Sequence, residues 1–249
     1  MSGTPWRLGL WAIGLAALVG VANVPTTTLQ GVNYIVTARS LPAYVKALDF
    51  AERDVNYKQL ARHITAGAAS DEARLRAVFE WTRANIRDTP PGFPLIDDHV
   101  WHIIIRGYGQ DDQKADVFTT LLGYAGVRAY WMFIGPRPEL TLSLVYVDGR
   151  WCPVDVANGV IFRAPDGHLA TATQLGEAHD LAVRQGPAAY QGLPYARYFE
   201  SFRPPVPPGI TRPEMQMLWP RLWFSARRLA GGGGSAWQKR PLAPQEPGR

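Results

Sequence analysis

One stretch constrains the fold more than any other, because a helical pattern leads directly into three strand-like runs. The helical pattern begins at Asp111 and ends at Gly126, a residue that suits a left-handed helix cap. Strand-like runs follow at 127–134, 140–147 and 150–156. Asp148-Gly149, between the last two runs, is a strong hairpin signal. The order of helix and then antiparallel strands predicts an α+β domain. The apolar face of the helix comprises Ala115, Phe118, Leu121, Leu122 and Ala125.

Two further helical patterns precede this stretch. A helix start is expected near Ala43, although residues 26–54 otherwise give no clear pattern, and the apolar residues of 55–66 fall on one helix face. Ser70, followed by two acidic residues, is typical of a helix N-terminus. That helix is expected to end before Pro90, because a proline disfavours helical geometry in the residue before it. Its apolar face comprises Leu75, Val78, Phe79, Thr82 and Ile86.

The run from Gly107 to Asp155 resembles the transglutaminase-like superfamily, which has a papain-like fold. The resemblance covers residues 55–175 and implies helices packed on an antiparallel sheet. In that family a thiol at a helix N-terminus is the nucleophile, a histidine opens a following strand, and an aspartate on the next strand orients the histidine. The matching motifs are Gly109-Gln110, Asp112 to Phe118, Leu121-Leu122, Gly126 to Ala129, Val145 to Trp151, and Val154-Asp155.

The residues at the three triad positions depart from this family. Asp111 stands where the resemblance places the cysteine, Leu140 where it places the histidine, and Asp155 retains the aspartate. Leucine cannot transfer a proton, and a carboxylate at a helix N-terminus is held ionised. Cys152 is the one cysteine of the chain and lies on an expected strand, where we predict a buried, inert thiol. We therefore expect no thiol-based acyl transfer from these positions.

Two interpretations of the site follow. The first is a catalytically degenerate domain that binds or scaffolds a peptide, glycan or protein partner in a cleft. The second is a hydrolase or transferase that uses Asp111 and Asp155 as a carboxylate pair on a glycan or ester, which requires both groups to face one open cleft. Both carboxylates also have a purely structural interpretation, Asp111 as the anion at a helix N-terminus and Asp155 as a hydrogen-bond acceptor. The candidates for the cleft lining are Trp101, Tyr108, Gln110, Tyr130 and Trp131.

No cofactor or metal is expected. His99 and His102 flank Trp101 in an apolar segment, a pattern more typical of packing than of metal binding. Gly107 and Gly109 do not form a phosphate loop, because neither the remaining glycines nor the lysine of such loops follow.

The positive charge of the chain is concentrated at its C-terminal end. Residues 1–202 carry 18 Lys and Arg against 19 Asp and Glu, whereas residues 203–249 carry 8 against 2. A nucleic-acid-binding domain carries its basic patch on the folded body, so we expect no nucleic-acid partner.

The N-terminal segment 8–24 is apolar and free of charge, with Arg7 on its N-terminal side. This pattern predicts an export signal that is either cleaved or retained as an anchor; the alternative is a buried helix of a cytosolic protein. We expect an exported protein at the bacterial inner membrane or in the periplasm, with an envelope protein or polysaccharide as partner. Residues 1–25 are assigned to this signal or anchor, and residues 40–202 to the transglutaminase-like domain.

Residues 203–249 are expected to form a Pro-rich, basic and aromatic extension. Within it, residues 215–230 combine tryptophans with arginines, which suits either a membrane interface or a segment packed back on the domain. Residues 231–235 are predicted to be a flexible linker, and residues 236–249 a disordered tail.

Overall fold

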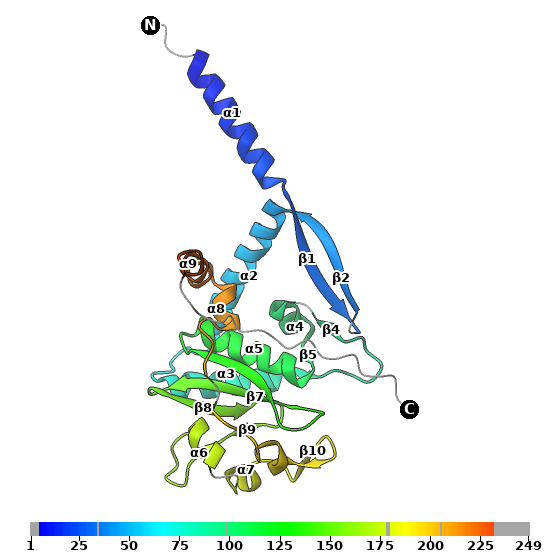
Figure 1. Ribbon diagram of the computed structural model, residues 1–249, viewed down its shortest axis with the longest axis vertical. Helices are drawn as coiled ribbons and strands as arrows, with labels where there is room; N and C mark the ends of the chain where they lie inside the picture. Colours follow the sequence, from blue (N-terminus) through cyan, green and yellow to red (C-terminus); the bar gives the residue numbers. More distant parts are fainter. Residues whose placement is uncertain (1–4, 34, 98, 178–179, 205, 232–249) are drawn as a thin grey trace.

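The computed structural model describes residues 5–231 except 34, 98, 178–179 and 205 (Figure 1). The tail expected at 236–249, and the linker beyond Gly231, lie outside the described residues. The helices are α1 (Pro5–Ala22), α2 (Ala43–Ile64), α3 (Asp71–Asn85), α4 (Val100–Arg106), α5 (Asp111–Tyr124), α6 (Ala172–Glu177), α7 (Asp180–Gln185), the 3-10 helix η1 (Tyr195–Tyr198), α8 (Arg212–Gln216) and α9 (Leu218–Leu229). The strands are β1 (Pro25–Val32), β2 (Ile35–Pro42), β3 (Arg87–Asp88), β4 (Ile96–Asp97), β5 (Tyr108–Gly109), β6 (Ala129–Ile134), β7 (Leu140–Val147), β8 (Arg150–Asp155), β9 (Val160–Ile161), β10 (Ala189–Tyr190) and β11 (Leu193–Pro194).

The domain is built around an antiparallel sheet with the strand order β6-β7-β8-β9. The turn between β7 and β8 uses Asp148 at φ 50° and Gly149 at φ 78°, the left-handed backbone that a two-residue hairpin of this sequence requires. The three strands predicted at 127–156 are therefore confirmed, and their register joins Val147 to Arg150. The α+β class follows from the same elements.

Side chains alternate between the two faces of this sheet, so each face has its own core. On one face, α5 and α3 pack against the sheet through Phe118, Leu122 and Val154. On the other face, the chain from α6 to η1 covers Leu140 and Leu144. Figure 1 shows the resulting layers, with α3 and α5 above the sheet and α6, α7 and β10 below it.

The predicted helices preceding α5 are also present. α2 begins at Ala43, as expected, and extends through the predicted 55–66 pattern as far as Ile64. Ser70 caps α3 by accepting a hydrogen bond from the backbone N–H of Ala73 at 3.1 Å. α3 ends at Asn85, ahead of the two prolines.

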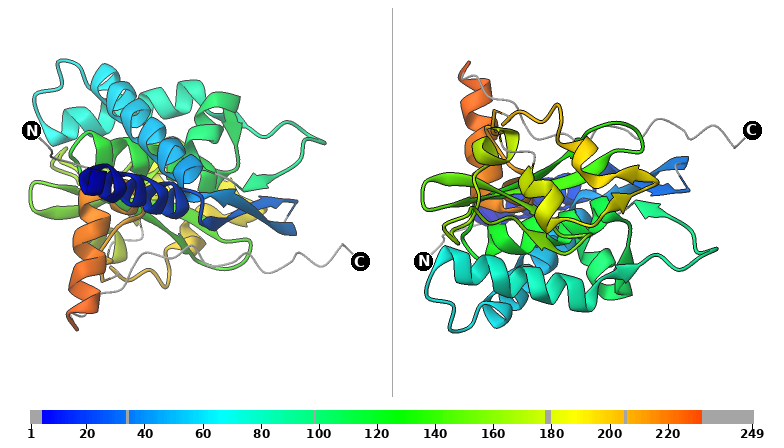
Figure 2. Two further views of the ribbon diagram at one scale, coloured as in Figure 1. Left: turned by 90° about the horizontal axis from the view of Figure 1, so that it is seen from above. Right: turned by 90° about the horizontal axis from the view of Figure 1, so that it is seen from below.

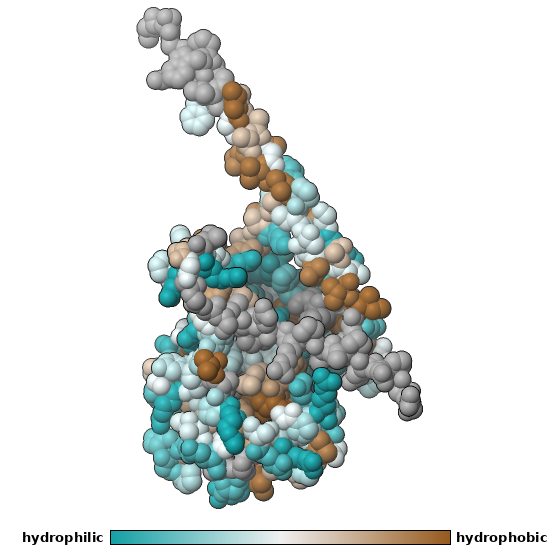
Figure 3. All heavy atoms as spheres, viewed as in Figure 1, coloured by the Kyte–Doolittle hydropathy of each residue, from teal (hydrophilic) through white to brown (hydrophobic). Residues whose placement is uncertain are grey.

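The N-terminal part of the chain joins this domain through β1, which pairs antiparallel with β4. α1 projects away from the sheet, and β1 and β2 pair antiparallel between α1 and α2 (Figure 1). Figure 3 shows hydrophobic side chains along α1 and on this β1–β2 ribbon, where Leu29, Ile35 and Val36 are exposed. No helix among the described residues is both long enough and apolar enough to cross a membrane. The strands β1 and β2 did not follow from the pattern of residues 26–54.

The C-terminal extension is joined to the domain at its start. Ile210 and Thr211 are buried, and the guanidinium of Arg212 lies 2.9 Å from the buried carboxylate of Asp116 on α5. α9 then extends outward at one side of the molecule, past the rest of the body, as the two views of Figure 2 show. Within the extension expected at 203–249, α8 packs on α5 before α9 begins.

Candidate functional site

Asp111 is the first residue of α5, where it lies at the positive end of the helix dipole. The preceding turn is held by the side chain of Gln113, which accepts a hydrogen bond from the backbone N–H of Gln110 at 3.1 Å and donates one to the carbonyl of Ile96 at 2.6 Å. Gly109 passes so close to Gln113 that a Cβ on this glycine would lie 3.0 Å from the Gln113 side chain. The start of α5 is therefore a fixed position rather than a free loop.

The carboxylate of Asp111 is engaged by groups from two other parts of the chain. The hydroxyl of Tyr190, on β10, donates a hydrogen bond of 2.6 Å to Oδ2. Lys114 lies one turn along α5, with Nζ 3.9 Å from Oδ1, and also pairs with Asp88. Burial, followed by the hydrogen bond to Asp111, raises the pKa of Tyr190 above its ordinary value, so that its hydroxyl remains a donor.

Asp155, the last residue of β8, is fully buried and accepts three hydrogen bonds. Tyr195 donates its hydroxyl to Oδ2 at 2.7 Å, and Asn158 donates both its backbone N–H, at 3.0 Å, and its side-chain amide, at 2.8 Å. Burial nevertheless raises the pKa of Asp155 above its ordinary value, because desolvation outweighs these donors. The negative charge of Asp111 adds to this increase.

Leu140 opens β7, where its side chain is fully buried. The register of β7 and β8 places Asp155 opposite Leu142, and Leu140 follows two residues along on the same face. Leu140 belongs to the same hydrophobic core as Tyr195. In this structure Asp155 accepts its hydrogen bonds from Tyr195 and Asn158. The side chain at position 140, a leucine, packs in the hydrophobic core.

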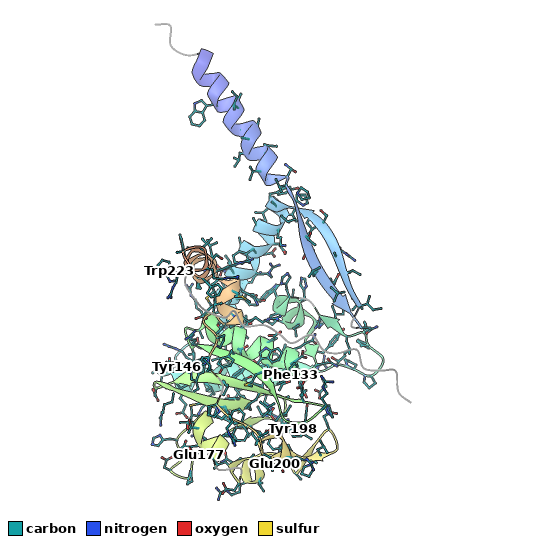
Figure 4. All side chains as sticks on the ribbon, viewed as in Figure 1. Phe133, Tyr146, Glu177, Tyr198, Glu200 and Trp223 are labelled. Atoms are coloured by element: carbon teal, nitrogen blue, oxygen red, sulfur yellow. The ribbon has the colours of Figure 1, made fainter. Side chains whose placement is uncertain are left out.

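The two tyrosines come from one segment that covers this face of the sheet. Tyr190 and Tyr195 flank the β10–β11 ribbon, and Tyr198 closes the segment by donating its hydroxyl to the carbonyl of Tyr190 at 3.1 Å. Figure 4 labels Tyr198 beneath the sheet, on the side away from α5. The sequence carried no signal for these contacts, because Tyr190 is 79 residues from Asp111 and Tyr195 is 40 residues from Asp155.

The five residues proposed to line a cleft lie in different places. Trp101, on α4, packs edge-on against Tyr57 at 5.4 Å, and Tyr108 packs edge-on against Phe93 at 5.5 Å. Gln110 belongs to the turn before α5. Tyr130 and Trp131 follow each other on β6 and so face opposite sides of the sheet, with Trp131 only 2% exposed and its indole N–H donated to Asp116 on α5 at 2.5 Å. These residues do not converge on one cleft.

Cys152, His99 and His102 were the other candidates for catalytic or metal chemistry. Cys152 is buried on the face of the sheet that packs against α5, and burial raises the pKa of its thiol to about 11. The rings of His99 and His102 lie 6.1 Å apart at the start of α4. Burial, with a smaller effect of Arg53, lowers the pKa of His99 to about 4, which leaves its imidazole neutral at pH 7. Among the described residues, no group of three His, Cys, Asp or Glu side chains is placed to hold a metal ion.

Comparisons with solved structures give distant matches. A suspected protease from Parabacteroides distasonis shares 16% identity over 48% of this chain and 28% of its own, with a TM-score of 0.36. A suspected cysteine protease from Cytophaga hutchinsonii shares 15% identity over 47% of this chain and 40% of its own, with a TM-score of 0.37. A TGase shares 12% identity over 64% of this chain and 50% of its own, with a TM-score of 0.35. This chain thus spans at most half of the length of these three proteins.

The comparison with curated proteins finds no match. The comparison with family models matches residues 58–156 to the core of the transglutaminase-like superfamily. The matched range runs from α2 to the first residue after β8 and includes Asp111, Leu140 and Asp155, the residues that the resemblance assigns to the triad positions. Residues 58–156 are therefore similar to the core of the transglutaminase-like superfamily.

Proposed function

We propose that this protein is a catalytically inactive transglutaminase-like protein of the cell envelope, which binds or scaffolds a peptide, glycan or protein partner. One observation carries the proposal. Asp111 and Leu140 stand where the resemblance places the thiol and the imidazole, and a tyrosine hydroxyl donates a hydrogen bond to each of the two carboxylates, Asp111 and Asp155.

Acyl transfer in this fold needs a thiolate, and neither position can supply one. A thiol at a helix N-terminus is acidified by the helix dipole and by a neighbouring imidazole. Cys152 lies instead on a strand, on the opposite face of the sheet from Asp155, and its pKa of about 11 leaves it protonated at pH 7. Leu140 has no group that could take or return a proton.

The alternative, in which Asp111 and Asp155 act as a carboxylate pair, has one observation in its favour. The raised pKa of Asp155 is what a general acid requires. However, a general acid must reach the substrate, whereas Asp155 has no exposed surface and already accepts three hydrogen bonds. The burial of Leu140 beside it supports an inactive site.

The envelope location is supported by two apolar surfaces. α1 is apolar along its length, and its described side chains from Trp11 to Val21 are largely exposed. α9 exposes Leu218, Trp219, Leu222 and Trp223. Of the two expectations for residues 215–230, a membrane interface or packing on the domain, these exposed side chains favour the first. Arginines accompany these side chains on α9, and a helix with exposed tryptophans and arginines suits the surface of an anionic bilayer.

Turnover measurements test the inactive site. We expect no hydrolysis of p-nitrophenyl acetate or of a glutamine-containing peptide above the rate of the Asp111→Asn variant. Saturable turnover by the native protein that Asp111→Asn abolishes would instead establish the carboxylate-pair enzyme. In a Cys152→Ser background, the variant Asp111→Cys with Leu140→His should gain a thiol that reacts with iodoacetamide, because it restores two triad groups to their positions.

Flotation with vesicles tests the role of α9. The full chain should bind vesicles containing phosphatidylglycerol more strongly than vesicles of phosphatidylcholine alone. Replacing Arg221, Arg227 and Arg228 by glutamine should remove this preference, because the attraction to anionic lipid resides in those cations. An unchanged preference would exclude α9 as the lipid-binding element.

A further inference from the structure

A pocket of about 290 Å³ lies over one face of the sheet, lined by residues of β6 and β8, the two neighbours of β7, and by the start of α6. It lies on the same face of the sheet as Asp155, but it uses none of the triad positions. Its volume is at the lower end of the range for small-molecule sites, roughly 300 Å³ upward, and suits a ligand of a single ring. Its lining includes Tyr130, Arg150, Trp151, Thr171, Thr173 and Pro204.

The walls of this pocket include an aromatic surface. Trp151 packs edge-on against Tyr130, with ring centroids 4.9 Å apart, and lies 5.1 Å from Tyr146. Tyr146, Trp151 and Tyr130 thus form a row of aromatic rings, and Figure 4 labels Tyr146 at one side of the sheet. An indole face can pack against the C–H groups on one face of a saturated sugar ring, and its π-electrons also attract cations.

The polar groups at the pocket are donors rather than acceptors. Tyr130 is only 4% exposed, and its hydroxyl has no hydrogen-bond partner in the described part of the chain. Burial raises the pKa of Tyr130 above its ordinary value, so this hydroxyl stays protonated and able to donate. The hydroxyl of Thr171 accepts the backbone N–H of Gln174 at 3.1 Å, which leaves its own proton for another acceptor.

Arg150 supplies the charge. It is exposed, and among the described residues its guanidinium has no ion-pair partner. An arginine recognises a carboxylate through two parallel N–H donors. A buried hydroxyl without a partner normally costs free energy, so the unpaired Tyr130 hydroxyl indicates that a ligand or an ordered water completes this site.

We propose that this pocket binds a carboxylated sugar ring, a hexuronic acid unit, with its carboxylate on Arg150, its ring against Trp151 and a ring hydroxyl on Tyr130. This proposal names a ligand class for the binding function proposed above, and it rests on that proposed function. The same chemistry is offered by a free hexuronic acid and by one unit of an acidic polysaccharide.

Calorimetric titration of the full chain tests this proposal. D-galacturonic acid should bind, and D-galactose, which lacks the carboxylate, should bind at least tenfold more weakly. Tetragalacturonic acid distinguishes the two sources: tighter binding of the tetramer indicates a polysaccharide, and tighter binding of the monomer indicates a free sugar acid. Turnover by the protein is measured separately, so a failure of the inactive-site proposal remains distinguishable from a failure of this one.

Substitutions assign the contacts. Arg150→Gln should weaken the binding of galacturonic acid by roughly tenfold, because the charge-assisted hydrogen bonds are lost. The affinities for the acid and for the neutral sugar should then be equal. Tyr130→Phe should weaken the binding of both sugars by about fivefold, since it removes a single neutral hydrogen bond. Arg39→Gln, an exposed arginine on β2, is the matched control and should bind as the native chain does.

Two outcomes would overturn the proposal. One is the absence of galacturonic acid binding by the native chain, and the other is an affinity for the acid that Arg150→Gln leaves unchanged. Circular dichroism of each variant verifies the fold, and Tyr130→Phe changes only one oxygen atom. Because Arg150 is exposed, its replacement leaves the hydrophobic core intact.

Discussion

Tyr195→Phe is the substitution that most directly tests how the buried carboxylate is held. The Tyr195 side chain is 1% exposed, and its hydroxyl donates to Oδ2 of Asp155 at 2.7 Å. Phenylalanine retains the ring and its packing against Phe199, where the centroids lie 5.2 Å apart. The variant therefore removes one hydrogen bond to a buried carboxylate without opening a large cavity.

The expected loss of stability follows from the charge of the acceptor. A hydrogen bond to an ionised group contributes about 1.5–3 kcal/mol to the free energy of unfolding. Two of the three donors to Asp155, both from Asn158, remain in the variant. We therefore expect Tyr195→Phe to lower the free energy of unfolding by about 2 kcal/mol at a pH above the folded pKa of Asp155, where the carboxylate is charged, and Tm by roughly 4–8 °C for a chain of this size.

The loss should depend on pH in a defined direction. The pKa of Asp155 is raised by burial, so its contribution to stability is fully present below the pKa of the unfolded chain and is lost as pH rises through the folded pKa. Tyr195 opposes this trend, because its hydroxyl stabilises the charged form. The cost of Tyr195→Phe should therefore be largest above the folded pKa. It should fall to about 1 kcal/mol in acid, where the acceptor is a neutral carboxyl group.

Urea unfolding followed by tryptophan fluorescence at pH 7.5 and pH 4.5 measures both effects. Tyr44→Phe provides the matched control, since the Tyr44 side chain is 46% exposed, and it should change the free energy of unfolding by less than about 0.5 kcal/mol. Equal stability of Tyr195→Phe and the native protein at pH 7.5 would refute the role of this hydroxyl. An equal loss at both pH values would show that Asp155 does not titrate in this range.

Three further substitutions or reactions test other parts of the structure. Arg212→Met removes the cation that lies 2.9 Å from the buried Asp116, and thermal or urea unfolding should show a loss of about 3 kcal/mol. Gly135→Ala should reduce the soluble yield and Tm markedly, because φ is +75° there and a Cβ would lie 2.6 Å from the ring of Tyr198. Cys152 should not react with iodoacetamide at pH 8 in the native state, given a thiol pKa of about 11, and should react once urea unfolds the chain; mass spectrometry measures this difference.

The sequence by itself determined the elements that depend on neighbouring residues. The apolar spacing of 111–126, the cap at Ser70 and the Asp148-Gly149 turn are local patterns, and each appears in the structure where the sequence predicts it. The motifs around Asp111, Leu140 and Asp155 assign these residues to the three triad positions, and that assignment stays a prediction. The strands β1 and β2 were missed, although Thr26 to Thr28 and the β-branched residues at 35–37 are typical of strands.

Only the tertiary structure decided what surrounds those triad positions. Tyr190 and Tyr195 reach the two carboxylates from a segment far along the chain, and no local pattern encodes a contact over 79 or 40 residues. The tertiary structure also decided the surroundings of Tyr130 and Trp131, which are neighbouring aromatic residues of one strand. The sheet directs their side chains to opposite faces. Trp131 therefore donates its indole N–H to Asp116, whereas Tyr130 lines the pocket. Local spacing fixes which element forms, whereas the packing of distant elements fixes which groups meet.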